Sequence, residues 1–167
     1  SDGFSERLVG DAPKYLEEGG FAHLLIGWLL HGDDWAERPR SWIDGCGCDA
    51  WLLQGVSRDR VTHAAVWNDE LVGDPGTYGE TIDRWIGYLE ELGANAVVEG
   101  ALILRRRSGV RNWFRADRIP EGRPTPASDH VLRVFDANDY LSAAPDESAL
   151  LDESPRLVER VRAEQEL

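Results

Sequence analysis

Apolar residues in the first thirty positions change from a helical spacing to a strand-like one. Within residues 4–16 they recur on one stripe, which is typical of an amphipathic helix packed on a sheet. Pro13 should kink this helix or mark a second start. Gly19 and Gly20 end it, and residues 22–30 follow with an apolar side chain at nearly every position. Such a strand is typical of the middle of a parallel sheet, so we expect helices on both of its faces.

The same spacing rules predict the elements that follow. Gly32-Asp33-Asp34 offers an N-cap for the next helix, and Gly93 is a helix stop. The expected elements are a helix through about residue 44, a strand at 49–55, helices at 58–70 and 77–92, and a buried strand at 95–106. The strands at 22–30 and 49–55 have the spacing of a right-handed crossover and should be parallel.

The pattern changes after residue 108. Residues 113–116 form a candidate short strand, 120–128 a linker rich in Pro and Gly, and 129–142 an amphipathic helix. Residues 157–167 fit either a helix or an alternating strand. We therefore expect an α/β domain over residues 1–108 and a small α+β extension over 109–167.

The composition indicates a folded, soluble protein. The chain has 167 residues, 42% of them hydrophobic and seven of them Trp, which is enough for a real core. No apolar run approaches the roughly 20 residues that span a bilayer, so we expect no membrane partner. Cys46 and Cys48 flank one glycine, too close for an ordinary structural disulfide. Two cysteines are also too few for a secreted disulfide scaffold, which favours the cytoplasm.

The net charge of −13 disfavours broad contact with nucleic acid or anionic lipid. Basic residues nevertheless gather in residues 105–118. Arg105, Arg106 and Arg107 lie close in sequence to Trp113, and arginines mixed with aromatic residues can grip phosphate and stack on bases. These four residues are therefore candidates for RNA contact. Alternatively, the arginines neutralise acidic neighbours at a strand end.

The carboxyl end of the first strand is a second candidate site, because ligands of open α/β sheets bind beyond the ends of parallel strands. Trp28, His31, Asp33 and Trp35 lie there and could wall a substrate pocket. The alternative is that an aspartate caps the next helix and the tryptophans pack in the core.

The sequence indicates no metal site and no catalytic residue. Cys46 and Cys48 could be combined with His31 or His63 as zinc ligands, but a matching second pair is missing. No signature of a catalytic thiol surrounds either cysteine. We expect the two cysteines to be small residues in a tight turn.

Residues 11–20, with Leu24-Leu25-Ile26 after them, resemble the helix and fifth strand of class I methyltransferases that use S-adenosylmethionine. The resemblance is to the small-domain branch, which includes glutamine methyltransferases acting on release factors. The Trp-rich run from Trp28 to Trp51 is similar to large actinobacterial members of that branch. The resemblance covers about residues 3–107 and implies a partial Rossmann-like sheet.

Three motifs that such enzymes use are missing from this sequence: a Gly-rich loop after the first strand, an acidic residue ending the second, and an Asn-Pro-Pro-aromatic loop after the fourth. Asp2 and Gly3 would begin just downstream of the last. The resemblance therefore implies that the chain is a fragment, the C-terminal portion of an enzyme whose N-terminal half is its partner. The parent would bind S-adenosylmethionine, whereas this chain would hold no cofactor. It would methylate a nitrogen of a protein, an RNA or a small molecule, with residues 57–94 as a substrate-recognition insertion.

The resemblance also implies a strand order. The family's last strand inserts antiparallel between its two predecessors, so residues 95–106 should lie between 22–30 and 49–55 in a three-stranded partial sheet. The outer side of strand 22–30 would then be an open apolar edge. Exposed edges recruit partners, so a homo-oligomer is expected there. The alternative function is a non-enzymatic interaction module that binds other proteins through this edge.

Overall fold

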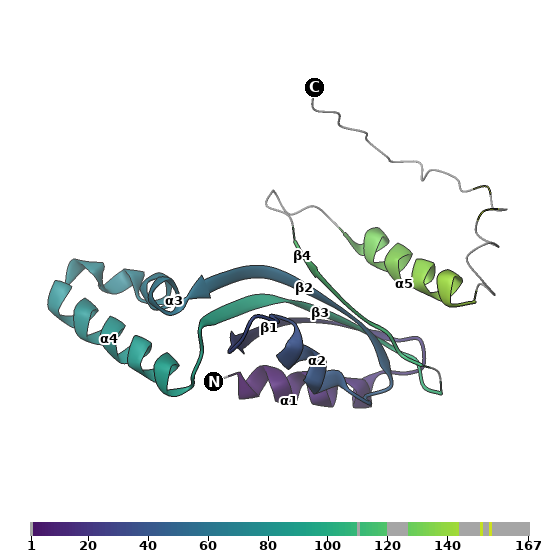
Figure 1. The fold of residues 1–167 in the computed structure, drawn as a ribbon, viewed down its shortest axis with the longest axis horizontal. Coiled ribbons are helices and arrows are strands. Elements are labelled where there is room, and N and C mark those ends of the chain that lie inside the picture. Colours follow the sequence, from purple (N-terminus) through teal and green to yellow (C-terminus); the bar gives the residue numbers. More distant parts are fainter. Residues whose placement is uncertain (1, 110, 120–126, 144–150, 152–153, 155–167) are drawn as a thin grey trace, which may run out of the picture. The chain divides into compact units, whose positions relative to one another are not determined.

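The computed structural model describes residues 2–109, 111–119, 127–143, 151 and 154 (Figure 1). The chain divides into two compact units, residues 1–121 and 122–167, and each unit is described by itself. The first unit includes strand β4 (Phe114–Arg118), which pairs with its sheet.

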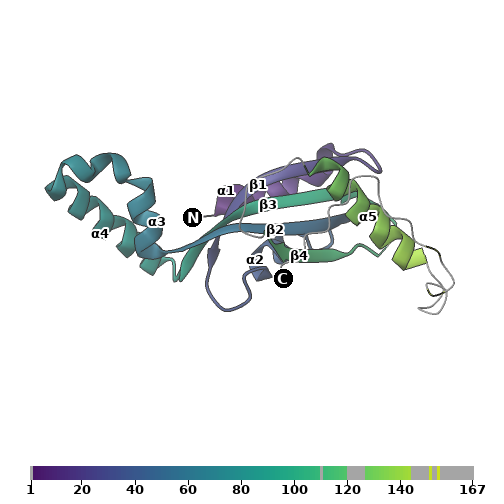
Figure 2. The ribbon, with the colours of Figure 1, turned by 90° about the horizontal axis from the view of Figure 1, so that it is seen from above.

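The first unit is an α/β unit built on a four-stranded mixed sheet (Figures 1 and 2). The other strands are β1 (Phe21–Leu30), β2 (Cys48–Asp59) and β3 (Ala96–Arg106), and the spatial order is β1-β3-β2-β4. Strand β3 runs antiparallel to both β1 and β2, whereas β4 runs parallel to β2. The expected position of the third strand between the first two is confirmed. The expected count of three strands is wrong, because β4 adds a fourth.

Helices α1 (Gly3–Asp11) and α2 (Glu37–Ile43) pack on one face of this sheet, with the short 3-10 helix η1 (Ala12–Tyr15) after α1. Because strand side chains alternate between faces, every second residue of β1 and β3 enters this core. Trp28, Leu102 and Leu104 pack there with Val9 of α1. Pro13 lies in the first turn of η1, so it marks a second helical start as expected.

Helix α2 begins later than the predicted cap at residues 32–34. Asp34 Oδ1 accepts a 2.9 Å hydrogen bond from the amide of Ala36, two residues on, so this aspartate closes a turn ahead of the helix. Helix α2 then starts at Glu37, without a side-chain cap at its N-terminus.

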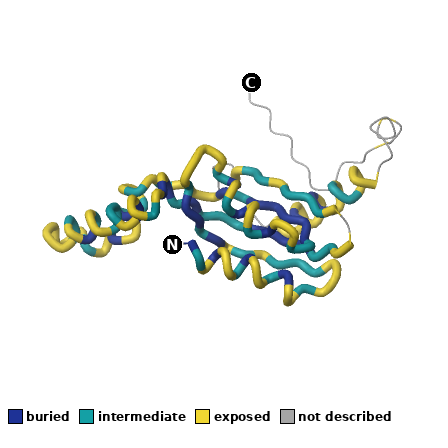
Figure 3. Tube along the Cα trace, turned by 60° about the horizontal axis from the view of Figure 1, so that its bottom comes forward, coloured by how far each residue is buried: buried dark blue, intermediate teal, exposed yellow. Residues whose placement is uncertain are grey.

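The prediction that β1 is buried on both faces is wrong. Buried residues gather on the inner positions of the sheet (Figure 3), but Leu25 of β1 is 87% exposed. Helices α1 and α2 both pack on the side of Ile26 and Trp28, and Leu25 points to the other side. Strand β1 is also an edge strand of the sheet, as expected.

A helical arm is inserted between β2 and β3 and extends from the end of the sheet (Figures 1 and 2). It contains α3 (Arg60–Trp67), the 3-10 helix η2 (Asp69–Gly73) and α4 (Pro75–Glu91). Both α-helices begin at an aspartate whose side chain accepts a backbone amide, Asp59 from Thr62 and Asp74 from Thr77. Gly93 follows α4 with φ of 66°, which suits a glycine helix stop.

The second unit contains helix α5 (Ser128–Ala143), which agrees with the helix expected at 129–142. The expected element at 157–167 and most of the expected linker at 120–128 lie outside the described residues. None of the helices described here is long and apolar enough to cross a membrane.

Candidate functional site

Trp28 and Trp35, two of the expected pocket residues, pack against each other. The indole Nε1 of Trp28 donates a 2.8 Å hydrogen bond to the carbonyl oxygen of Trp35, and the two ring centroids are 6.5 Å apart. Trp28 is 1% exposed and belongs to the core between the sheet and α1 and α2. The indole N–H of Trp28 is therefore already hydrogen-bonded within the protein.

His31 and Asp33 lie apart from this pair. The Nδ1 atom of His31 is 3.0 Å from the carbonyl oxygen of Gly93, and Asn95 donates a 2.9 Å hydrogen bond to the carbonyl of His31. These bonds tie the end of β1 to the turn between α4 and β3. Asp33 is exposed. Trp28 thus contacts Trp35, whereas His31 binds the turn that follows α4.

A hollow lies where the arm, the sheet and the start of α1 come together. We call it the apolar groove, and its volume is about 1190 Å³. Its walls come from the N-terminal residues, from parts of β1, β2 and β3, and from both arm helices. The lining residues include Asp2, Phe4, Ser5, Leu25, Gly27, Trp28, Leu29, His63, Trp67, Arg84, Trp85, Tyr88 and Glu99.

The groove presents large apolar side chains to solvent. Leu25 is 87% exposed, Phe4 72%, Trp67 58% and Tyr88 48%. Single exposed apolar residues are ordinary on protein surfaces, whereas several around one hollow mark a site of interaction. The groove is therefore the strongest candidate binding site in the part of the chain that the structure describes.

His63 of α3 lies between two tryptophans of the arm wall. Its ring centroid is 6.1 Å from that of Trp67 and 5.8 Å from that of Trp85. The Nδ1 atom of His63 is buried and has no hydrogen-bond partner within the described structure. Burial lowers the pKa of His63 below 6.5, Arg58 lowers it further, and Glu99 opposes them. Burial therefore disfavours the charged form of His63.

The two carboxylates in the groove are both held by arginines. Glu99 Oε2 is 3.1 Å from Nη1 of Arg58. Asp2 accepts hydrogen bonds of 2.8 and 2.9 Å from Arg38. Each of these two acids has an arginine partner, so their charges in this apolar and aromatic groove are compensated.

Side chains near the N-terminus occupy part of the outer edge of β1. Ser5 Oγ accepts a 3.2 Å hydrogen bond from the amide of Gly27, and Asp2 Oδ2 accepts a 3.1 Å bond from the amide of Leu29. Two amides of the exposed edge are thereby satisfied. Any added strand would have to pair nearer the start of β1, around His23 and Leu25.

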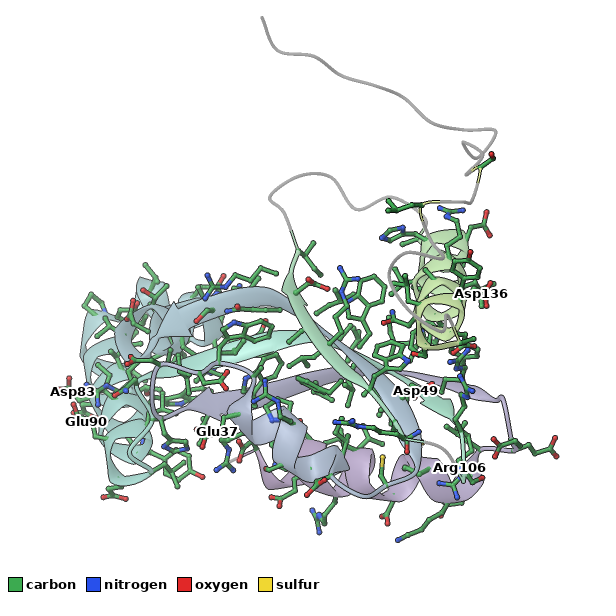
Figure 4. All side chains as sticks on the ribbon, turned by 45° about the vertical axis from the view of Figure 1, so that its right-hand side comes forward. Glu37, Asp49, Asp83, Glu90, Arg106 and Asp136 are labelled. Carbon is green, nitrogen blue, oxygen red and sulfur yellow. The ribbon has the colours of Figure 1, made fainter. Side chains whose placement is uncertain are left out.

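The arginines proposed for RNA contact gather around a buried carboxylate. Arg105 is 7% exposed and its Nη2 lies 2.7 Å from Oδ2 of Asp49. Nη1 of Arg107 lies 3.9 Å from the same oxygen, and Arg106 donates a 2.6 Å bond to the carbonyl of Cys46. Figure 4 shows Asp49 and Arg106 at the end of the sheet away from Asp83 and Glu90 of the arm.

The fourth RNA candidate, Trp113, joins this group through its backbone. Its amide nitrogen is 3.3 Å from Oδ1 of Asp49, and the side chain of Asn112 reaches the same oxygen at 3.3 Å. The arrangement neutralises a buried acid, as in the alternative interpretation of the arginine run. A guanidinium as buried as that of Arg105 has little surface left for phosphate.

Both cysteines are free thiols; Cys46 lies in the turn before β2, whereas Cys48 is the first residue of that strand, so the expected turn holds only for Cys46. Burial raises the pKa of Cys48 to about 11, which disfavours the reactive thiolate. Among the described residues, no three His, Cys, Asp or Glu side chains are grouped so that they could hold a metal ion.

No protein-family model matches the chain, and no curated protein matches it either. The groove therefore has to be interpreted from its own geometry.

Sequence reasoning missed the residues of the groove wall. Trp85 was expected on the apolar face of the helix at 77–92, where it would normally be a core residue. His63, Trp67 and Tyr88 carried no local signal of binding. Their grouping depends on how α3 packs on α4, which no short segment of the sequence specifies.

Proposed function

We propose that this chain is the substrate-recognising, C-terminal part of a methyltransferase that uses S-adenosylmethionine and methylates a nitrogen acceptor. The observation that carries the proposal is the strand order. Strand β3 is the last of three consecutive strands, yet it lies between β1 and β2 and runs against both. The methyltransferase resemblance implies this order and these directions, so the sheet supports a partial Rossmann-like fold.

The position of the groove supports the same proposal. Asp2, Phe4 and Ser5 line it, and the resemblance puts these residues just downstream of the loop that holds the acceptor nitrogen. The arm at residues 60–91, which fills most of the proposed recognition insertion, supplies the aromatic wall of the groove. An acceptor held there would gain its reactivity from positioning and from the exclusion of water.

The cofactor itself does not fit the residues of the groove. A nucleotide ribose needs a free acidic side chain, whereas Asp2 and Glu99 are both paired with arginines. The Gly-rich loop that would cradle the methionine end is also missing from the sequence. We therefore assign no cofactor-binding residue in this chain, and the chemistry of the methyl donor would depend on the rest of the parent enzyme.

Two measurements test this proposal. Calorimetric titration of the 167-residue chain with S-adenosylmethionine should show no micromolar binding, because the cofactor segments belong to the parent. The full-length gene product should transfer labelled methyl groups from S-adenosylmethionine to an acceptor. Trp85→Ala should reduce this labelling and Tyr15→Ala, outside the groove, should not. A full-length product without any cofactor-dependent labelling would contradict the proposal.

A second candidate function is protein interaction through the edge of β1, which could also join two copies of the chain. The observation that favours it is the exposure of Leu25 on an edge strand. His23→Pro should abolish such an assembly, because proline cannot complete a strand ladder. Light scattering behind size exclusion would detect the change, and an unaltered mass for the variant would exclude this edge as the interface.

A further inference from the structure

Gly27 lies on the floor of the apolar groove, and the fold does not require a glycine there. A Cβ atom added at this position would meet only the carbonyl oxygen of Val98, at an ordinary 3.7 Å. Gly27 is also absent from the described glycines with positive φ. Glycine weakens a strand interior, and one without a packing reason often marks the close approach of a ligand. The missing side chain leaves a flat floor between Leu25 and Leu29.

The opposite wall is aromatic. His63 is stacked obliquely between Trp67 and Trp85, with interplanar angles of 50° and 43°. Tyr88 and Trp67 each leave about half of their surface in solvent, at 48% and 58%. Flat, partly exposed rings that line the same groove as Gly27 offer stacking surface to another planar ring.

The charges around the groove favour an uncharged occupant. Glu99 and Asp2 are compensated by Arg58 and Arg38, and burial disfavours the charged form of His63. An ionic ligand would lose its hydration in an apolar groove without gaining a buried counter-charge. Arg84 is the exception: it lines the rim, is exposed, and donates a 3.1 Å bond to Thr81. Arg84 is preceded in α4 by the exposed Asp83, and Glu90 lies further along the same helix (Figure 4).

We propose that the apolar groove binds an uncharged planar aromatic ring, which lies over Gly27 and packs against the wall of Trp67 and Trp85. The ring is the chemical class of the methyl acceptor, a step that rests on the proposed function. Binding of the ring itself needs only the groove. It can therefore be measured on the 167-residue chain without the methyl donor.

The probe for this test is N-phenyl-1-naphthylamine, an uncharged fused ring whose fluorescence rises in apolar sites. We expect saturable binding to the chain and about a tenfold loss of affinity in Gly27→Leu, because the new side chain fills the floor. Gly79→Leu is the matched control, since Gly79 also has open space around it but lies outside the groove. Its affinity should stay within about twofold of the wild type.

A second pair of variants keeps the test decisive if Gly27→Leu fails to fold. Trp67→Ala should weaken binding about fivefold or more, because the exposed ring provides stacking area. Tyr15→Ala removes an even more exposed ring outside the groove, 84% exposed, and should leave binding unchanged. Far-UV circular dichroism would verify that each variant is folded. Binding that neither Gly27→Leu nor Trp67→Ala weakens would overturn the proposal.

The charge preference is tested with 1-anilinonaphthalene-8-sulfonate, which carries the same rings and one sulfonate. We expect it to bind about tenfold more weakly than the uncharged probe. Equal or tighter binding, reduced by Arg84→Gln, would show that the groove takes an anion and would overturn the uncharged class.

Ring binding without methyl transfer by the full-length product would refute the proposed function alone. Methyl transfer without ring binding would refute the acceptor class alone.

Discussion

Nη2 of Arg105 donates a 2.7 Å hydrogen bond to Oδ2 of Asp49 across the β2–β3 ladder, where the two residues are direct partners. The side chain of Asp49 is 1% exposed and that of Arg105 is 9% exposed. The other oxygen of Asp49 accepts from the amide of Trp113, just before β4. One buried carboxylate therefore links β2, β3 and the residue that precedes β4.

Asp49→Ala should destabilise the first unit by about 3–5 kcal/mol, because it leaves the guanidinium of Arg105 buried without its counter-charge. Urea denaturation followed by tryptophan fluorescence would measure the loss. Asp11→Ala is the control, since Asp11 pairs with Lys14 at an exposed site and should cost less than about 1 kcal/mol. Equal effects of the two variants would show that the Asp49 contacts contribute no more than a surface pair.

Gly100→Ala should destabilise the sheet by about 2 kcal/mol or more, since overpacked sites must shift their backbone. The added Cβ would lie 2.1 Å from the carbonyl oxygen of Leu53 and 3.1 Å from the ring of Trp28. Gly27→Ala is the matched strand control and should be neutral or slightly stabilising, because its Cβ would meet only the carbonyl oxygen of Val98, at an ordinary 3.7 Å. Thermal denaturation of both variants provides the comparison. A tolerated Gly100→Ala would mean that the strands are less closely packed at this point.

The stability of the first unit should depend on pH through His63. Its folded pKa is lowered, chiefly by burial, so between that value and 6.5 the unfolded chain binds the proton more readily. The free energy of unfolding therefore rises with pH through this window. The contribution of His63 is fully present above pH 6.5 and is lost below its folded pKa. Denaturation at about pH 7.5 and about pH 5.5 would measure the slope. His63→Gln should flatten it, whereas His23→Gln, at an exposed site, should not.

Cys48 should react slowly with iodoacetamide while the chain is folded. Burial, followed by the effect of Cys46, raises the pKa of Cys48 from 9.0 to about 11. At about pH 8 the thiolate fraction should then be roughly 100-fold below that of an unperturbed thiol. The Cys46→Ser variant isolates the reaction of Cys48, and the same variant in urea supplies the unfolded rate. Similar rates in the two conditions would contradict the burial of this thiol.

Much of the first unit could be predicted from local patterns. The apolar runs located β1, β2 and β3, and the Gly93 stop located the end of the arm. The end of β2 was predicted too early: the strand runs to Asp59, past a bulge between Gln54 and Val56. A bulge shifts the alternation of side chains, so the strand pattern is lost in the sequence although pairing continues.

The burial of β1 and the groove could not be predicted in this way. Leu25 has the same character as its buried neighbours, and an apolar run does not reveal which side lacks a covering helix. The expected pocket used Trp28, His31, Asp33 and Trp35, which are adjacent in sequence. The groove instead unites Phe4, Gly27, Trp67 and Tyr88, which only the strand order and the packing of the arm bring together.

The central position of β3 also constrains how the first unit is made. Strands β1 and β2 leave the ribosome before β3, but both form their antiparallel ladders with β3 rather than with each other. Until residues 96–106 have been synthesised, the apolar strands β1 and β2 lack the central strand with which both of them pair. The sheet can then close only through contacts far apart in sequence, which are slow to form. The nascent chain should therefore depend on chaperones until β3 has been synthesised.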